Sequence, residues 1–269
     1  MALSLTSGVG QGFLSQQLAA SQSRTNSLFQ QLASGNRINQ AADGAAVMGM
    51  LSSMTSSIQG NNAAMGGINQ GVAVTQVADA GLASVGEGLQ GLRDLAVQAA
   101  NGTLSASDRT TLQTQAQALQ SQINGVIGNT SFNGQNLLNA GQNVNVQTGS
   151  GAADQTALTM PNLTGAMPAI NLSTQAGASN AISAIDTALD SINQSRAQMG
   201  AAQSGLESSY ANLQNMNIAT TSAASGMQGT DYAQATAELT SSSIRQQFSV
   251  AMMAQMNNLS AQGVLGLLH

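Results

Sequence analysis

The sequence predicts a mainly α-helical protein: an elongated coiled-coil rod of long antiparallel helices, with a small β-hairpin region and paired terminal helices. Apolar residues recur at alternating intervals of three and four residues over most of the chain, which is the heptad pattern of helices that pack along one seam. The chain of 269 residues holds only two prolines, so the periodic stretches are free of helix breakers. Aromatic residues make up 2% of the sequence, and small or aliphatic apolar residues suit closely spaced helices.

The first periodic stretch predicts an amphipathic helix that ends at a Ser-Gly pair. Its seam positions are Leu14, Leu18, Ser21, Thr25, Leu28 and Leu32. The helix pauses in the segment LASGNRINQAADGAA, residues 32–46, which contains Arg37 and Asp43 although only 6% of the chain is charged. This pause marks a junction between two helical regions.

Two longer periodic stretches follow, at about residues 45–100 and 181–226. Helices of ~45 to ~55 residues are roughly 65 to 80 Å long, which is why the expected object is a rod. A shorter helix at about residues 107–127 should turn back antiparallel to the helix at 45–100. It is expected to begin at a capping box formed by Ser105 and Asp108.

Polar residues interrupt the seam of the 181–226 stretch. Arg196, Gln203 and Asn217 occupy seam positions, where such residues set the register between helices at some cost in stability. The irregular segment at about 129–178 contains both prolines, and within it VNVQTG and QTALTM are predicted as short strands. A last helix, at about residues 231–259, is expected to pair with the first.

The composition excludes several classes of function. The six basic residues are all arginine and the net charge is −5, so no basic patch for nucleic acid is expected. Cysteine is absent and the single histidine, His269, is the last residue, so the sequence predicts no catalytic residue, metal site or cofactor site. No apolar run approaches the ~18 residues of a spanning helix, and membrane insertion is not expected.

The segment at residues 32–46 resembles the bacterial flagellin motif Leu-x-Ser-Gly-x-Arg-Ile-Asn-x-Ala-x-Asp-x-Ala-Ala. Further segments resemble flagellin in the family's order: GINQGVAVTQVADAGL, LQGLRDLAVQAANGT, TSFNGQNLL, and the C-terminal TDYAQATAEL through VLGLL. The opening MALSLTSGVG and the near-terminal MNNLSAQGVL depart from the family pattern. The resemblance nevertheless covers most of the chain outside the irregular segment.

The resemblance implies two domains. An inner domain combines residues 1–41 and 230–269, and a rod domain covers 42–229, without the hypervariable outer domains of larger flagellins. On this interpretation Ser34, Gly35 and Asn36 form a spoke between the domains, and Arg37 and Asp43 are candidates for an ion pair that sets the angle there. The alternative is a capped helix break with solvated charges.

The resemblance also implies the function. The chain is expected to be a secreted, extracellular subunit of the flagellar filament, exported by the flagellar type III apparatus and self-assembling into a helical homopolymer for motility. The implied partners are other copies, an export chaperone, and cap and hook-junction proteins. The expected polymerisation seams are apolar positions of the two terminal helices: Leu14, Leu18, Leu28, Leu32, Ile244, Phe248, Leu259, Val264, Leu265, Leu267 and Leu268.

One departure from the family concerns the vertebrate innate immune receptor. Flagellins that it detects read Leu-Gln-Arg-x-Arg-Glu-Leu, whereas this chain has Gly91 at the first arginine position and Gln115 where Glu is usual. Arg93 and Leu95 match. Because losing an arginine anchor is costly at an interface, receptor recognition is predicted to be weak.

Three alternatives stay open at this point. A hook–filament junction protein shares the terminal helices, but the segments around residues 89–103 and 130–138 favour the filament subunit. A type III translocator would carry a long apolar hairpin, which this sequence does not contain. An enzyme is the weakest candidate, because no combination of residues here supports chemistry.

Overall fold

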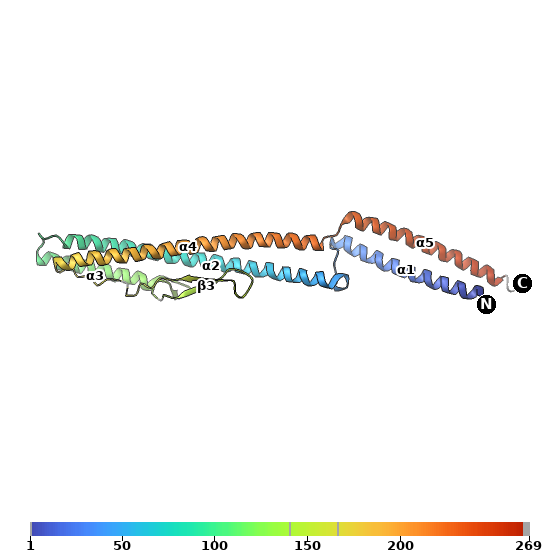
Figure 1. Ribbon diagram of the computed structural model, residues 1–269, viewed down its shortest axis with the longest axis horizontal. Coiled ribbons are helices and arrows are strands. Elements are labelled where there is room, and N and C mark those ends of the chain that lie inside the picture. The colour runs from blue at the N-terminus through green and yellow to red at the C-terminus, as the bar shows by residue number, and fades with distance from the viewer. Residues whose placement is uncertain (1, 140, 166, 266–269) are drawn as a thin grey trace. The chain divides into compact units, whose positions relative to one another are not determined.

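The computed structural model describes residues 2–139, 141–165 and 167–265, with only the backbone described at 2–10, 260 and 263–265. The chain is mainly helical, as predicted (Figure 1). The helices are α1 (Ala2–Ser34), α2 (Ala41–Ala99), α3 (Ala106–Asn129), α4 (Gln175–Gln228) and α5 (Tyr232–Leu265). The strands are β1 (Ser131–Phe132), β2 (Gln135–Asn136), β3 (Asn143–Gln147) and β4 (Gln155–Thr159).

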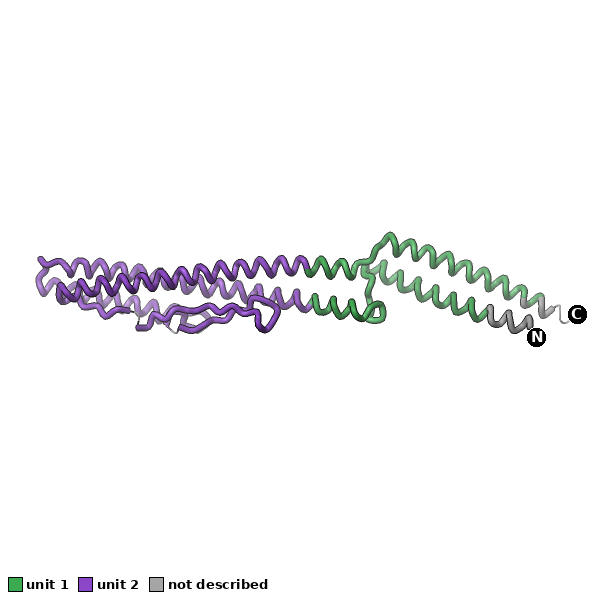
Figure 2. The backbone as a smooth tube through the Cα atoms, viewed as in Figure 1, with its two compact units in different colours: residues 1–55, 220–269 green, residues 56–219 purple. Residues whose placement is uncertain are grey.

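The chain divides into two compact units, coloured separately in Figure 2. Unit 1 consists of residues 1–55 and 220–269, and unit 2 of residues 56–219. Both divisions fall inside long helices, because α2 and α4 each contribute residues to both units. The assignment of residues 42–55 and 220–229 to a rod domain therefore stays a prediction.

The core of unit 2 lies along the seam where α2 and α4 pack antiparallel. Heptad positions of α2 such as Leu82, Leu89 and Leu92 are fully buried, and so are Ile185 and Leu206 of α4. Full burial of such side chains stabilises a fold by roughly 1.5–3 kcal/mol each. The spacing therefore predicted both the helices and the faces that they bury.

Polar contacts join the same two helices at the side of this seam. Arg196 pairs with Asp79, with 2.8 Å between Nε and Oδ1. The amide of Asn61 donates to Asn217 over 3.0 Å, and Asn217 also bonds across the helix pair to Asn62. Two of the three predicted polar seam residues thus contact α2, whereas Gln203 bonds to Glu207 on its own helix.

Helix α3 begins at the predicted capping box. The Ser105 side chain accepts from the Asp108 N–H over 3.2 Å, and the Asp108 carboxylate accepts from the Ser105 N–H over 3.0 Å. These bonds satisfy N–H groups that a helix start otherwise leaves unpaired. Next to the cap, the Arg109 guanidinium donates to three backbone carbonyls of the α2–α3 turn, those of Ala99, Asn101 and Leu104.

A glycine allows α3 to approach α2 closely. A Cβ atom on Gly88 would lie 2.6 Å from Cγ1 of Ile123, closer than side-chain atoms approach one another. Any larger residue at position 88 would push the buried Ile123 side chain away.

Two β-hairpins complete unit 2. Strands β3 and β4 pair antiparallel, with Val146 opposite Thr156, and they correspond to the predicted VNVQTG and QTALTM strands. The β1–β2 hairpin was not predicted. It turns at Asn133 and Gly134, whose φ angles of 49° and 79° are those of a type I′ turn. The Asn-Gly dipeptide was the signal that could have predicted it.

None of the helices in the described part of the chain combines the length and the apolar character needed to cross a bilayer.

Candidate assembly interface

The predicted N-terminal seam faces α5 within the same chain. Among its members Thr25 and Leu28 are buried, while Leu14, Leu18, Ser21 and Leu32 are partly buried. Every fourth or third residue of α1 thus points at α5, as a heptad seam requires. The two terminal helices pair with each other.

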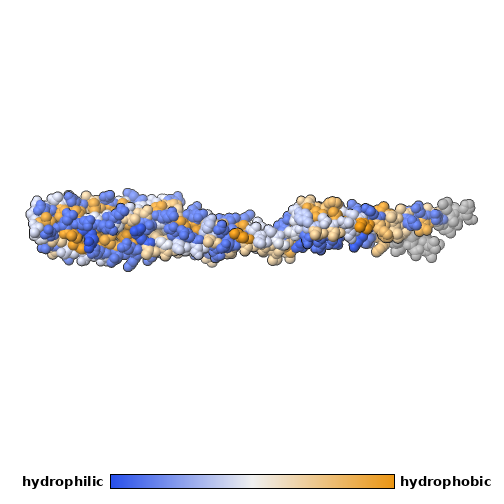
Figure 3. All heavy atoms as spheres, turned by 90° about the horizontal axis from the view of Figure 1, so that it is seen from above, coloured by the Kyte–Doolittle hydropathy of each residue, from blue (hydrophilic) through white to orange (hydrophobic). Residues whose placement is uncertain are grey.

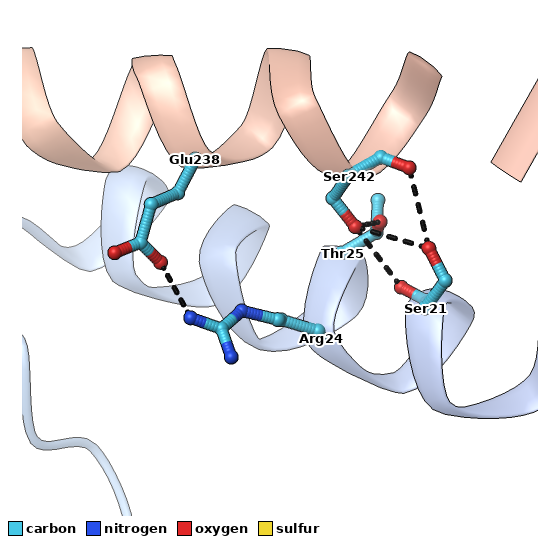
Figure 4. A network of polar contacts seen from close by, with 5 residues as sticks. All are labelled: Ser21, Arg24, Thr25, Glu238 and Ser242. Carbon is cyan, nitrogen blue, oxygen red and sulfur yellow. Dashed lines mark hydrogen bonds and ion pairs between the residues drawn. The ribbon is translucent and has the colours of Figure 1, made fainter. Parts of the chain in front are cut away.

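The α5 side of this seam consists largely of small and polar residues. Ala235, Ser242 and Ser249 are buried there. Figure 4 shows the hydroxyl network at its centre. Ser21 Oγ donates to the Ser242 carbonyl over 3.2 Å, and Ser242 Oγ donates to the Ser21 carbonyl over 3.3 Å. Thr25 Oγ1 lies 3.0 Å from Ser242 Oγ. These bonds satisfy buried hydroxyls but bury little apolar surface.

One ion pair links α1 and α5. Arg24 Nη2 lies 2.9 Å from Glu238 Oε2, with side-chain exposures of 65% and 38% (Figure 4). The hydrogen bond and the charge of Arg24 lower the pKa of the Glu238 carboxyl below its usual value. Because both side chains are solvated, the pair contributes little to stability.

A different stripe of α5 carries large apolar side chains. Ile244, Phe248 and Leu259 are 61%, 67% and 59% exposed, and on α1 Phe13 and Phe29 are 67% and 56% exposed. Figure 3 shows hydrophobic surface next to hydrophilic surface on the terminal helices. Large exposed apolar side chains on neighbouring turns mark a surface that contacts another molecule.

The expected seam positions therefore fall into two groups. The leucines of α1 face α5 inside the chain, whereas Ile244, Phe248 and Leu259 face away from it. The side chains of Val264 and Leu265, and all of Leu267 and Leu268, lie outside the described residues.

The segment after α1 is braced by main-chain hydrogen bonds. Helix α1 ends at Ser34, and Gly35 follows with φ of 71°, a left-handed conformation that favours glycine. Asn36 then forms an antiparallel bridge with Gly229. On either side of it the Thr230 N–H donates to the Gly35 carbonyl over 3.0 Å and the Arg37 N–H donates to the Gln228 carbonyl over 2.7 Å. The segment that links α1 to α2 and the segment that links α4 to α5 are thus hydrogen-bonded to each other.

The ion pair predicted between Arg37 and Asp43 is not formed. Arg37 Nη2 instead donates to the Met227 carbonyl over 3.1 Å. Asp43 Oδ2 accepts from the N–H groups of Asn39 and Gln40 over 3.0 and 2.9 Å. The prediction was wrong because Asp43 lies in the first turn of α2, where unpaired N–H groups compete for its carboxylate. The alternative of a capped helix break describes this junction better.

The residues of the predicted receptor patch lie in unit 2. A Cβ atom on Gly91 would lie 2.9 Å from Cδ2 of Leu119, so this position is covered by α3. Arg93 pairs with Asp186, with 2.6 Å between Nε and Oδ1, which raises the pKa of the guanidinium further above its usual value. Leu95 is partly buried and Gln115 is exposed.

Comparison with known proteins identifies both ends of the chain. Residues 11–143 match the bacterial flagellin N-terminal helical region, and residues 182–268 match the C-terminal helical region. Flagellin of Halalkalibacterium halodurans is 33% identical, over 89% of this chain and 90% of its own. Flagellin of Listeria innocua is 30% identical, over 85% and 86%. The crystal structure of Bacillus cereus flagellin aligns at a TM-score of 0.50 and 30% identity, over 54% of this chain and 86% of that one.

Proposed function

Because the chain belongs to the bacterial flagellin family and is a subunit of the flagellar filament, we propose that α1 and α5 make the inner contacts of that filament. As a flagellin the protein is structural, is not an enzyme, and is a component of the extracellular flagellum. The alternative of a hook–filament junction protein is set aside, since both helical regions are those of flagellin. What remains to be assigned is which surfaces of the chain hold the copies together.

The apolar stripe of α5 is the observation that carries this proposal. Ile244, Phe248 and Leu259 remain more than half exposed although the helix already has a partner in α1. Covering what is still exposed of each of them would contribute up to roughly 1.5–3 kcal/mol. Helix α5 thus presents its large apolar side chains outward and its small side chains to α1.

The form of the polymer follows from the kind of contact. The exposed stripe of α5 and the exposed phenylalanines of α1 are different surfaces, so a contact between them is heterologous. A heterologous contact that does not close into a ring continues as an open helical filament. Repetition of this one contact between copies is therefore sufficient to build the body of the filament.

Export and the remaining partners belong to the same proposal. A two-helix pair whose seam is small and polar on the α5 side is only marginally stable alone, because helices gain most of their stability from tertiary packing. We expect α1 and α5 to be largely unfolded in the monomer, which suits export through the flagellar type III channel and delays premature assembly. An export chaperone and cap and hook-junction proteins are the expected partners before and during assembly.

Substitutions in the apolar stripe test the assignment of the contact surface. The double variant Ile244→Ser and Phe248→Ser should abolish seeded filament growth, measured by negative-stain electron microscopy and sedimentation. Thr240→Ser with Gln247→Ser changes exposed polar positions of the same helix and should leave growth unchanged. If the Ile244→Ser and Phe248→Ser double variant forms filaments at the same protein concentration as the wild type, the proposal is wrong.

Removal of the whole C-terminal helix gives a coarser test. Deleting residues 230–269 should leave a soluble, helical monomer, because the core of unit 2 is retained. That monomer should not polymerise under any precipitant or seed. If it forms filaments, the terminal helices are not the inner contacts.

Weak recognition by the innate immune receptor is a further part of the proposal. No cationic side chain is present at position 91, and the glycine there packs under Leu119. In a receptor reporter assay we expect a much smaller response than an enterobacterial flagellin gives. A response of equal size would contradict this expectation.

A further inference from the structure

The chain contains three Asn-Gly dipeptides, which begin at Asn101, Asn124 and Asn133. Asparagine is most prone to lose its side-chain amide when glycine follows, because glycine has no side chain to shield its own main-chain nitrogen. All three asparagines are exposed, so access to water does not distinguish them. What differs is how the fold holds each asparagine and the nitrogen that follows it.

Asn124 is held by helix α3, whose interior it occupies. Each interior N–H of an α-helix donates to a carbonyl one turn earlier, so the nitrogen of Gly125 is engaged. To attack the side chain of Asn124, this nitrogen would have to leave the helix and break hydrogen bonds on both sides. The helix therefore protects Asn124.

Asn101 is held by hydrogen bonds in the turn between α2 and α3. Its Oδ1 accepts from the N–H of Thr103 over 3.1 Å and from Thr103 Oγ1 over 3.0 Å. Its main-chain carbonyl accepts from the Arg109 guanidinium over 2.8 Å. That carbonyl belongs to the peptide group that must rotate if the nitrogen of Gly102 is to reach the side chain. Both reacting groups are therefore fixed.

Asn133 occupies the turn between β1 and β2 without such bonds. The pair that closes this hairpin is Phe132 with Gln135, so Asn133 and Gly134 lie outside the ladder. Among the described residues the Asn133 side chain has no hydrogen-bond partner, and a Cβ atom on Gly134 would meet nothing within 4 Å. Each strand is only two residues long, so the turn can rotate with the loss of few hydrogen bonds.

We infer that Asn133 is a site of spontaneous deamidation. The nitrogen of Gly134 attacks Cγ of Asn133, and a C–N bond forms between them. The nitrogen gives up its proton and the side-chain amide leaves as ammonia, which closes a five-membered succinimide ring. Water then opens the ring at either of its two carbonyls and leaves aspartate or isoaspartate at position 133. Water is the only other reactant.

The isoaspartate product should open the tip of the hairpin. It lengthens the main chain by one atom inside a two-residue turn, and the geometry of such a turn fixes the register of its strands. The segment that follows stays anchored, because Leu137 and Leu138 are buried and a Cβ atom on Gly81 would lie 2.9 Å from Cδ1 of Leu138. The site lies wholly within unit 2 and is independent of how copies assemble.

Site-resolved mass spectrometry of the full-length protein, aged at mildly alkaline pH, measures the conversion of each asparagine. Asn133 should convert about tenfold faster than Asn101 and Asn124, a factor that corresponds to roughly one net hydrogen bond. In the same protein unfolded by guanidinium, the three rates should become similar, because glycine follows each asparagine. Conversion of Asn133 no faster than that of Asn101 in the folded protein would overturn the inference. So would a preference for Asn133 that is equally large after unfolding.

Two variants test the physical causes. Thr103→Ala removes one bond to the Asn101 side chain and should speed conversion there, whereas Thr114→Ala removes a similar hydroxyl from the surface of α3 and should not.

Asn133→Gly keeps a residue that accepts a positive φ in the turn and cannot deamidate. On ageing, protease cleavage within residues 131–136 should increase in the wild type and stay constant in Asn133→Gly. An equal increase in both proteins would show that deamidation at position 133 does not open the hairpin.

Discussion

The seams of unit 1 and unit 2 have the same spacing but differ in the side chains that fill them. In unit 2 the α2–α4 seam buries Leu89, Ile185 and Leu206 completely. In unit 1 the α1–α5 seam buries Leu28 but also Thr25 and Ser242, which are joined by a hydrogen bond. A heptad pattern therefore specifies that two helices meet but leaves open how strongly they hold each other.

The difference is one of apolar surface and where it points. Unit 2 hides its large aliphatic side chains, whereas α5 hides serine and presents Ile244 and Phe248 outward. A helix pair arranged in this way has more to gain from neighbours than from its own partner. The comparison suggests that unit 2 is the self-sufficient part of the subunit and that the terminal pair is completed by assembly.

The largest expected effect separates the two seams by the same substitution. Leu82→Ala removes a fully buried side chain of unit 2 and should lower the free energy of unfolding by about 2–5 kcal/mol. Leu18→Ala, at a partly buried seam position of α1, should lower it by less than about 1 kcal/mol. Urea unfolding followed by circular dichroism measures both. Equal losses would mean that the two seams do not differ in the way proposed.

The next effect compares the helix connections of the two units. Arg109 donates to three carbonyls in the α2–α3 turn, whereas the Arg37 side chain donates to one. Arg109→Ala should therefore destabilise unit 2 by about 2–3 kcal/mol, and Arg37→Ala should have a smaller effect because main-chain bonds already brace its segment. Thermal unfolding measures both losses of stability. A larger loss for Arg37→Ala than for Arg109→Ala would contradict this prediction.

A smaller effect tests the hydroxyl network of unit 1. Thr25→Val keeps the side-chain shape and removes one hydroxyl beside Ser242, which retains its bonds to Ser21. We expect the stability of the terminal pair to change by no more than about 1 kcal/mol, measured by hydrogen exchange in assembled filaments. A loss several times larger would show that this hydroxyl is essential to the seam.

The smallest expected effect is a loss of stability at acid pH, which comes from a different carboxyl group in each unit. In unit 1 Arg24 lowers the pKa of Glu238, and in unit 2 the hydroxyl and N–H of Ser105 lower the pKa of Asp108. A carboxyl whose folded pKa is lowered contributes stability above its unfolded pKa and loses it as the pH falls through the folded value. Both contributions should therefore fade below about pH 4.

Neutral variants assign this sensitivity to each unit. Glu238→Gln should remove the acid-dependent part of terminal-pair stability, seen in the melting temperature of assembled filaments between pH 7 and about pH 3. Asp108→Asn should remove that of the α3 cap, seen in the melting temperature of the monomer over the same range. Asp94→Asn, an exposed carboxylate without a hydrogen-bond partner among the described residues, is the matched control. If the control flattens the pH profile as much as the other two, the named contacts are not its source.

Local chemistry was sufficient to predict much of this protein. The heptad spacing placed the long helices and the buried faces of α2 and α4, because a side chain's position on a helix depends only on its place in the repeat. The Ser105–Asp108 cap and the β3–β4 strands followed from short motifs whose partners lie within a few residues. The β1–β2 hairpin was also within reach, since Asn133 and Gly134 carry the turn signal.

The tertiary structure decided which surfaces meet. Helix α5 carries a small polar stripe and a large apolar one at helical spacing, and periodicity alone favoured the apolar stripe with Ile244 and Phe248. The polar stripe faces α1 instead, because short side chains let the helices approach until Ser21, Thr25 and Ser242 bond across the seam. Likewise the partner of the Arg37 side chain is a main-chain group that only the folded junction brings within reach, the Met227 carbonyl, which is 190 positions away in the sequence. The partners of Asp43, the N–H groups of Asn39 and Gln40, are by contrast local.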